Sequence, residues 1–405
     1  MTMLFKSKGA MILLMLNMFL AMAAFGLVVP VMPEYIKMLG LSGTIAGFLT
    51  AAFAVTQLFF SPFAGRFSDQ YGRKKAIVFG MVVLAVSEAI FALGSSAIWL
   101  FISRFLGGLG IAFVAPAVMA FIADITTEQE RAKGIGYISA AMSTGFLIGP
   151  GIGGFLAEYG TRVPFYAAAI GAGIAALITW LVLPEVNRVN NGDVKNGIST
   201  SNQGILRMII SSVKAPYFNA LIVLLVLGFA LSNFETVFGL YLDAKYNFNP
   251  KDIAVIMTIG AVVGVIIQLG ILDLLVKKIG ELKVIYLSLL VAGLSIMCII
   301  IANSYWSLIF VTIIVFAACD LLRPAASSYL SKQAGTDQGY VAGLNSSYNS
   351  IGTIIGSAAA GILYDVSIGL PYIIAGAILI LCYFSLLVVD KSKPRARNKT
   401  FEKIK

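Results

Sequence analysis

The chain of 405 residues is 59% hydrophobic and only 12% charged, with a formal net charge of +10. Soluble globular proteins carry about 25% charged residues, which excludes a soluble core of this length and makes a lipid bilayer the main solvent. The chain has no histidine, so any proton chemistry must fall on carboxylates. Its three cysteines, Cys298, Cys319 and Cys382, lie in apolar runs without metal-like or disulfide-like spacing.

Apolar runs of roughly 20 residues, the length that crosses a bilayer as a helix, recur along the chain. The first run follows Lys6 and Lys8 like a signal peptide, but it is too long for one and is predicted to be a retained span. In chain order the predicted spans are 10–30, 45–65, 76–96, 98–122, 134–157, 164–183, 216–242, 252–272, 283–303, 306–330, 340–363 and 370–389. The sequence therefore predicts an all-α polytopic membrane protein with twelve transmembrane helices.

A polar stretch, 184–215, separates the sixth span from the seventh and is predicted to be a flexible linker. It divides the chain into two six-helix bundles, 1–183 and 216–390. A basic tail, 391–405, follows the last span. We expect this tail to lie along anionic lipid headgroups on the inner side of the membrane and not to bind nucleic acid.

The distribution of lysine and arginine predicts the orientation, because cytoplasmic segments of membrane proteins carry the excess. With both termini inside, 23 of the 29 basic residues fall in inner segments. Four fall in outer loops, namely Lys37, Arg162, Lys245 and Lys251. The sequence thus predicts a multi-pass protein of the plasma membrane with cytoplasmic N- and C-termini.

The two halves repeat each other in two places. The glycines of the fifth span recur in the eleventh after a constant shift of 207 residues: Gly145, Gly149 and Gly154 against Gly352, Gly356 and Gly361. The acidic and basic residues after the second span recur after the eighth: Asp69, Arg73 and Lys74 against Asp273, Lys277 and Lys278. Together these matches indicate duplicated, pseudo-symmetric halves.

Five charged residues lie inside predicted spans: Glu88, Arg104, Glu235, Asp320 and Arg323. Each costs about 2.5–3.5 kcal/mol at a helix centre, so it persists where it faces a cavity or finds a partner. Structural ion pairs and a proton or substrate site both remain open for Glu235, Asp320 and Arg323. Glu88 is interpreted as structural, because no charged residue lies one turn away on its helix.

Asp320 and Arg323 are three residues apart, which places them on one helix face. Burial disfavours the charged carboxylate while the nearby arginine favours it, and these opposed effects suit an acid that gains and loses a proton during transport. Glu235, in the middle of the seventh span, is the second candidate acid.

The fifth span contains closely spaced small residues around Pro150, including Gly153. Small residues every four positions let helix backbones approach, and a proline permits a kink. The pattern is typical of a tight helix contact, and it is also where one half could pivot on the other.

Several motifs resemble the major facilitator superfamily along essentially the whole chain. The segment from Gly65 to Lys75, which contains Asp69, Gly72, Arg73 and Lys74, resembles the signature loop between its second and third helices. Arg104 resembles its helix-four motif, and Gly149 with Pro150 resembles the antiporter motif of its drug–proton exchangers. Within that twelve-helix drug:proton antiporter family, the chain is similar to the NorA-type quinolone and multidrug exporters of Gram-positive bacteria.

The resemblance implies a drug–proton antiporter in which Glu235, Asp320 and Arg323 couple proton movement to export. It implies a substrate pocket made of Phe25, Phe53, Gln57, Arg104, Ser143, Phe146, Phe238 and Phe316. It implies small-molecule drugs and protons as partners, no cofactor or metal, and a monomer. Met22 and Ser143 depart from an aromatic residue and an asparagine in that group, which affects the expected drug range.

Two other functions remain as alternatives. The same fold would serve an uptake symporter for a sugar or metabolite, against which the Gly149–Pro150 motif argues. A membrane enzyme or receptor is the second alternative, but the sequence shows no cofactor-binding or nucleophile motif that would support catalysis. It also lacks the glycine-rich phosphate-binding loop that ATP-driven pumping would need.

Overall fold

The computed structural model describes residues 2–185, 205–213, 215–333 and 338–392, and this part of the chain is almost entirely helical, without strands. Its helices are α1 (Thr2–Gly26), α2 (Val28–Leu39), α3 (Gly43–Tyr71), α4 (Arg73–Leu93), α5 (Ala97–Ile125), α6 (Glu128–Ala157), α7 (Val163–Val182), α8 (Ile205–Ser212), α9 (Phe218–Tyr246), α10 (Pro250–Ile279), α11 (Glu281–Cys298), α12 (Tyr305–Gln333), α13 (Gln338–Val366) and α14 (Leu370–Ser392).

The predicted all-helical membrane fold is confirmed. Eleven helical segments in the described ranges are long and apolar enough to cross a membrane, with α1 and α2 together forming the first. The remaining predicted span, 340–363, corresponds to α13, which is 29 residues long but carries several polar residues. It packs between α9 and α3, so its polar side chains lie among protein neighbours.

The first span is longer than its apolar run and is broken in the middle. Leu27 interrupts the helix between α1 and α2, and the chain then continues as helix to Leu39. Pro30 and Pro33 follow the break, and neither can donate a backbone hydrogen bond. The helix ends at Gly40, whose φ of 62° is the left-handed conformation that favours glycine.

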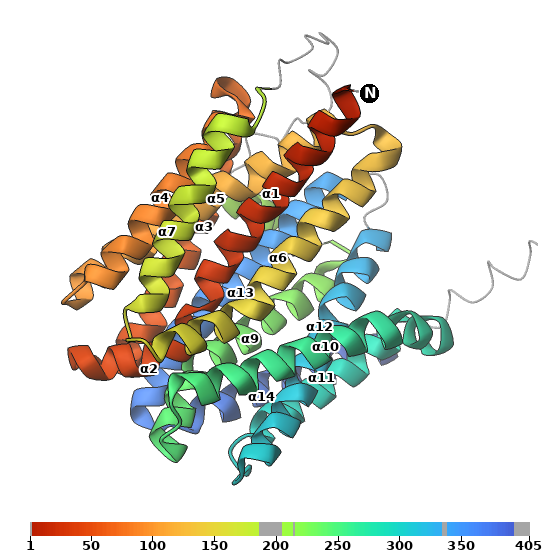
Figure 1. The fold of residues 1–405 in the computed structure, drawn as a ribbon. Coiled ribbons are helices and arrows are strands. Elements are labelled where there is room, and N and C mark those ends of the chain that lie inside the picture. The colour runs from red at the N-terminus through yellow and green to blue at the C-terminus, as the bar shows by residue number, and fades with distance from the viewer. Residues whose placement is uncertain (1, 186–204, 214, 334–337, 393–405) are drawn as a thin grey trace, which may run out of the picture.

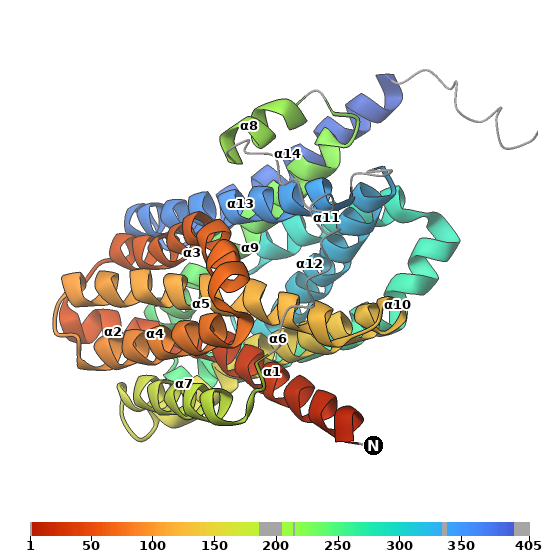
Figure 2. The ribbon, with the colours of Figure 1, turned by 90° about the horizontal axis from the view of Figure 1, so that it is seen from above.

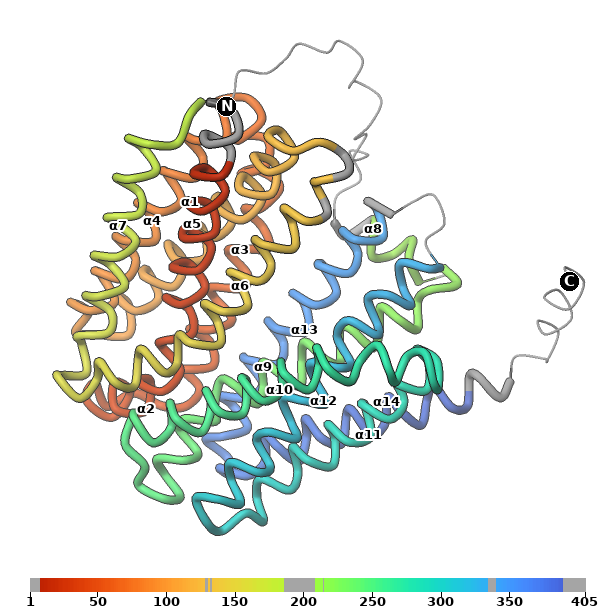
Figure 3. Tube along the Cα trace, turned by 45° about the vertical axis from the view of Figure 1, so that its right-hand side comes forward, coloured from red at the N-terminus to blue at the C-terminus, as the bar shows by residue number. Residues whose placement is uncertain are grey.

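The helices gather into two halves, which we call the N-terminal half (α1–α7) and the C-terminal half (α8–α14). Figures 1 and 3 show the two groups side by side, diverging towards the face where α1 begins and meeting at the opposite face near α2 and the start of α10. Seen from above, α3 and α13 lie along the boundary between them (Figure 2). We name these two ends the N-terminal face and the opposite face.

The glycines shared by the two halves perform equivalent packing. On α6, a Cβ added at Gly145 would lie 2.3 Å from the carbonyl oxygen of Phe19 on α1. On α13, a Cβ added at Gly352 would lie 2.2 Å from the carbonyl oxygen of Leu225 on α9. Gly145 and Gly352 therefore hold helices together within a half.

The third glycine of each set, nine residues further along its helix, makes a contact between the halves. A Cβ at Gly154 of α6 would lie 2.2 Å from the Cβ of Ala254 on α10. A Cβ at Gly361 of α13 would lie 2.4 Å from the carbonyl oxygen of Gly43 at the start of α3. Backbones from opposite halves thus touch near the opposite face, by the same geometry on both sides.

A second repeated feature is an ion pair with reversed charges. Arg73 at the start of α4 pairs with Asp124 near the end of α5, at 3.1 Å. Glu281 at the start of α11 pairs with Lys332 near the end of α12, at 2.8 Å. Both residues of the second pair lie 208 positions after those of the first. The two halves therefore have an ion pair at equivalent positions, with the acidic and basic residues exchanged.

The offset of 208 residues between the halves corrects the match of Asp273 with Asp69 that was predicted from the sequence. The helices α3 and α10 end at Gly72 and Gly280, which have positive φ angles of 106° and 84° and also lie 208 residues apart. Asp273 lies 204 residues after Asp69, so the acidic match is one helical turn out of step with the structure. The charge pattern indicated a duplication correctly, but its alignment was wrong.

The predicted linker, 184–215, lies partly outside the described residues. Its described part contains the eight-residue helix α8, which the sequence interpretation did not include. Ser212 at the end of α8 shares a hydrogen bond of 2.8 Å with the hydroxyl of Tyr348 on α13. The predicted basic tail, 391–405, is described only in the last residues of α14, and its side chains lie outside the described set.

Candidate functional site

A cavity of about 430 Å³ lies between the two halves and receives side chains from both. Its lining includes most of the side chains predicted from the sequence: Phe25, Phe53, Arg104, Ser143 and Phe146 from the N-terminal half, and Glu235, Phe316, Asp320 and Arg323 from the C-terminal half. It also contains polar residues that the sequence did not single out, among them Gln268, Asn349 and Thr353.

The acidic wall of the cavity is formed by α9 and α12. Glu235 lies on α9, and its Oε1 atom is buried without a hydrogen-bond partner among the described residues. A charged oxygen in that setting is costly, and a proton or a bound cation relieves the cost. Asp320 lies on α12 against Gly264 of α10, where an added Cβ would be 2.8 Å from the carboxylate oxygen Oδ2.

Asp320 and Arg323 both face the cavity, as their spacing predicted. No ion pair within 4.0 Å joins them in the described part of the chain, and Arg323 is exposed. The carboxylate of Asp320 is therefore not locked to a fixed partner. A free carboxylate of this kind can take up a proton or accept a hydrogen bond from a positively charged group.

The opposing wall is aromatic. The ring of Phe25 on α1 lies 5.0 Å from that of Phe53 on α3 and 6.0 Å from that of Phe146 on α6. One further ring, that of Phe316 on α12, lines the cavity on the same helix as Asp320. Aromatic faces attract flat rings by stacking and organic cations by cation–π contact.

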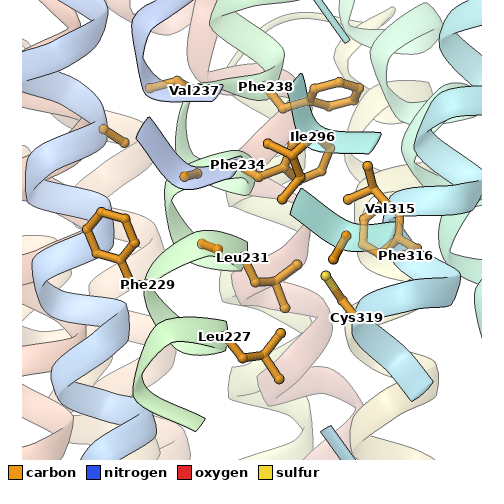
Figure 4. Packing of buried hydrophobic residues seen from close by; sticks show 14 of the residues in the cluster. Leu227, Phe229, Leu231, Phe234, Val237, Phe238, Ile296, Val315, Phe316 and Cys319 are labelled. Atoms are coloured by element: carbon orange, nitrogen blue, oxygen red, sulfur yellow. The ribbon is translucent and has the colours of Figure 1, made fainter. Parts of the chain in front are cut away.

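Two predicted pocket residues do not reach the cavity. Phe238 is fully buried in the C-terminal half, with its ring 4.6 Å from that of Phe234. Figure 4 shows both rings beside Ile296 and the α12 side chains of the hydrophobic cluster. Gln57 does not line the cavity, and its backbone nitrogen lies against Gly108 of α5. Side-chain direction around a helix, which the motif match did not resolve, decides both cases.

Arg104 has a partner that the sequence interpretation did not find. Its Nη2 atom donates to Glu88 Oε1 at 3.3 Å, with the two side chains only 4% and 1% exposed. Glu88 comes from α4 and Arg104 from α5, so a search for charges along one helix could not pair them. The useful signal was one unmatched acid and one unmatched base on consecutive spans.

The signature segment from Gly65 to Lys75 connects the ends of α3, α4 and α5 at the N-terminal face. Arg73 contacts Asp69 one turn earlier and Asp124 on α5. Gly72 makes the turn with a φ of 106°, which L side chains rarely adopt. Lys74 follows in the first turn of α4, and a Cβ at Gly65 would meet nothing within 4 Å. The roles of Arg73, Asp69 and Gly72 are thus visible in the geometry, whereas Gly65 shows no packing constraint.

The glycine-rich stretch of α6 packs mainly against the first span. Gly149 approaches Ala23, and Gly153 approaches the break at Leu27, where an added Cβ would be 2.4 Å from the carbonyl oxygen. Pro150 lies inside α6, its ring against Gly26. This stretch therefore supports the broken first span that carries Phe25 into the cavity.

The opposite face is closed by polar contacts between the halves. Lys37 on α2 pairs with Asp243 on α9 at 2.6 Å, and Lys251 on α10 pairs with Glu158 at 2.9 Å. The carboxylate of Asp365, at the end of α13, accepts hydrogen bonds from the backbone N–H groups of Gly43 and Thr44 and from the Thr44 hydroxyl. The halves diverge towards the N-terminal face (Figures 1 and 3), and these contacts join them at the opposite face.

No cluster in the described ranges is suited to a metal ion, since no group of three or more acidic or cysteine side chains converges there. The polar groups that line the cavity are carboxylates, two arginines, amides and hydroxyls, and they lie beside aromatic rings.

Comparisons with known proteins agree with this architecture. The model of the Major Facilitator Superfamily matches residues 14–281 and 220–405. Multidrug resistance protein 2 of Bacillus subtilis is 44% identical over 93% of this chain and 94% of its own. Quinolone resistance protein NorA of Staphylococcus aureus is 40% identical over 89% of this chain and 91% of its own.

Solved structures share the fold at low sequence identity. The nucleoside transporter NupG superposes with a TM-score of 0.78 at 16% identity, covering 95% of this chain and 100% of its own. A bacterial homologue of the human lysosomal transporter Spinster, in an inward-facing and occupied conformation, gives 0.79 at 15% identity over 95% and 97%. The described residues form twelve long helices in two halves, and the family model matches most of the sequence, so the chain belongs to the major facilitator superfamily.

Proposed function

We propose that this protein is a multidrug efflux transporter that exchanges protons for amphipathic cationic or zwitterionic compounds. The observation that carries the proposal is the central cavity, where carboxylates from α9 and α12 face aromatic rings from α1, α3 and α6. Stacking surfaces tolerate many flat ring systems, whereas a carboxylate requires positive charge. The multidrug and quinolone resistance relatives, similar over nearly their full length, support the same function.

Coupling follows from competition at the acids. A substrate cation and a proton both neutralise Glu235 or Asp320, and neither acid has an ion-pair partner within the described residues that would neutralise it permanently. Binding of one ligand therefore disfavours binding of the other. When the cavity opens alternately to the two sides of the membrane, protons entering from the outside displace the substrate and are released inside, without a cofactor.

The direction of transport depends on orientation. Cytoplasmic segments carry the excess of basic residues, so the distribution of lysine and arginine makes the N-terminal face cytoplasmic and places both termini inside the cell. Because polar contacts join the halves at the opposite face, we infer that the cavity opens to the cytoplasm, in the state that loads substrate. We place the protein in the plasma membrane, and we infer that it acts as a monomer because one chain forms both walls of the cavity.

Transport of ethidium and norfloxacin by inverted membrane vesicles tests this function. We expect uptake driven by an imposed pH gradient, collapse by an uncoupler, and background rates for Glu235→Gln and Asp320→Asn at normal protein levels. Glu34→Gln makes the same chemical change at an exposed position of α2 and serves as the control. Full pH-driven transport by both single cavity variants would refute the coupling scheme.

A further inference from the structure

The ion pair between Glu88 and Arg104 forms a layered element in the wall of the cavity. Arg104 lines the cavity and Glu88 does not, so the arginine lies in front and the carboxylate lies behind it. The Arg104 guanidinium carbon also lies 4.3 Å from the centre of the Phe91 ring. A molecule in the cavity therefore meets a cation whose charge is balanced from within the protein.

The neighbouring residues hold the two charges in place. Ser87 donates to the carbonyl oxygen of Ser103 at 2.7 Å, and Ser103 donates to that of Ser87 at 2.8 Å. These reciprocal bonds fix α4 against α5 at the residues directly before Glu88 and Arg104. The position of each charge is thus set by the helix pair and does not depend on the ion pair alone.

The pair is incompletely satisfied, which distinguishes it from an ordinary structural salt bridge. Arg104 Nε and Glu88 Oε2 are buried and have no hydrogen-bond partner among the described residues. A buried N–H donor on a cavity-lining arginine is suited to donate a hydrogen bond to an oxygen of a bound molecule, which a carboxylate supplies. An arginine without Glu88 behind it would repel positively charged molecules.

We propose that Glu88 is a specificity-determining residue: by neutralising Arg104 from behind it admits organic monocations to the cavity, while Arg104 remains able to bind the carboxylate of a zwitterion. The inference rests on the proposed function and extends it, because it names two substrate classes that the same cavity serves through different charges. Monocations use the acidic wall alone, and zwitterions use the acidic wall and Arg104.

The expected effect is large enough to measure. One unit charge about 10 Å from a bound cation, at an effective dielectric constant of about 20, changes binding by roughly tenfold. Removing the charge of Glu88 is therefore expected to lower transport of a monocation about tenfold relative to a zwitterion. Removing the charge of Arg104 is expected to move the same ratio in the other direction.

The test compares ethidium, a permanent monocation, with norfloxacin, a zwitterion, in vesicles containing equal amounts of the full chain. We expect the ethidium-to-norfloxacin ratio to fall about tenfold in Glu88→Gln, to rise in Arg104→Gln, and to return towards the wild-type value in the double variant. Ser87→Ala breaks a buried hydrogen bond beside the pair without changing charge, and its ratio should stay at the wild-type value.

A merely structural role for Glu88 would lower both transports in parallel and leave the ratio unchanged, which would overturn the proposal. If the Glu88→Gln protein does not accumulate, the Arg104→Gln variant tests the proposal by itself. An unchanged or lowered ethidium-to-norfloxacin ratio in that variant would contradict the proposal. If the wild-type chain transports neither compound, the proposed function fails. Equilibrium binding of both compounds to the purified variants then decides the charge selectivity by the same ratio.

Discussion

Asp365 offers a direct test of how the opposite face is held closed. Its carboxylate bridges the halves by accepting two backbone N–H groups and one hydroxyl at the start of α3, at 2.5–2.9 Å. Replacing a capping acceptor by alanine costs about 1 kcal/mol, and losing a negative charge at a helix N-terminus costs about 0.5 kcal/mol at an exposed site. Asp365→Ala should therefore weaken the closed arrangement by about 1.5 kcal/mol, or roughly tenfold in population.

Spin labels at Met38 and Ile368, exposed positions on either side of this contact, report the separation of the halves by pulsed electron resonance in a cysteine-free background. We expect a longer distance to gain population in Asp365→Ala. Asp365→Asn keeps an acceptor but loses the charge, so it should show an intermediate shift, and Glu34→Gln should show none. An unchanged distance distribution in Asp365→Ala would refute the assignment of this carboxylate as a clamp.

The closed face allows two further predictions. In Gly154→Leu the new side chain cannot fit against α10, since even a Cβ would lie 2.2 Å from that of Ala254, so this variant should abolish transport. Gly136→Ala, at a site where an added Cβ meets no atom within 4 Å, should retain transport. A transport assay with protein quantification distinguishes the two outcomes. Lys37→Asp should slow transport by placing like charges against Asp243, and the double variant with Asp243→Lys should restore it. Failure of the exchange to rescue activity would refute a role for the charge pairing seen at 2.6 Å.

Much of the fold was predictable because the bilayer imposes one simple requirement on each span. Each predicted span overlaps a helix of the structure, since a run of apolar residues of sufficient length has few alternatives. The break at Leu27 and the helix α8 were not predicted. Both depend on tertiary neighbours, the glycines of α6 in one case and Tyr348 in the other.

The candidate site was predictable to the extent that charge is unusual in a membrane helix. Glu235, Asp320 and Arg323 stood out for this reason, and the structure places all three at the cavity. The pairing of Glu88 with Arg104 required knowledge of which helices are neighbours. The direction of Phe238 required its rotation about α9, and a motif match contains neither kind of information.

The exchanged ion pairs at the starts of α4 and α11 also bear on assembly. A hairpin formed between the wrong partners, α4 with α12 or α11 with α5, would set Arg73 against Lys332 and Glu281 against Asp124. Each incorrect pairing would bring like charges together, whereas each correct one is attractive. The exchange of acid and base therefore favours pairing of each helix end with its partner in the same half.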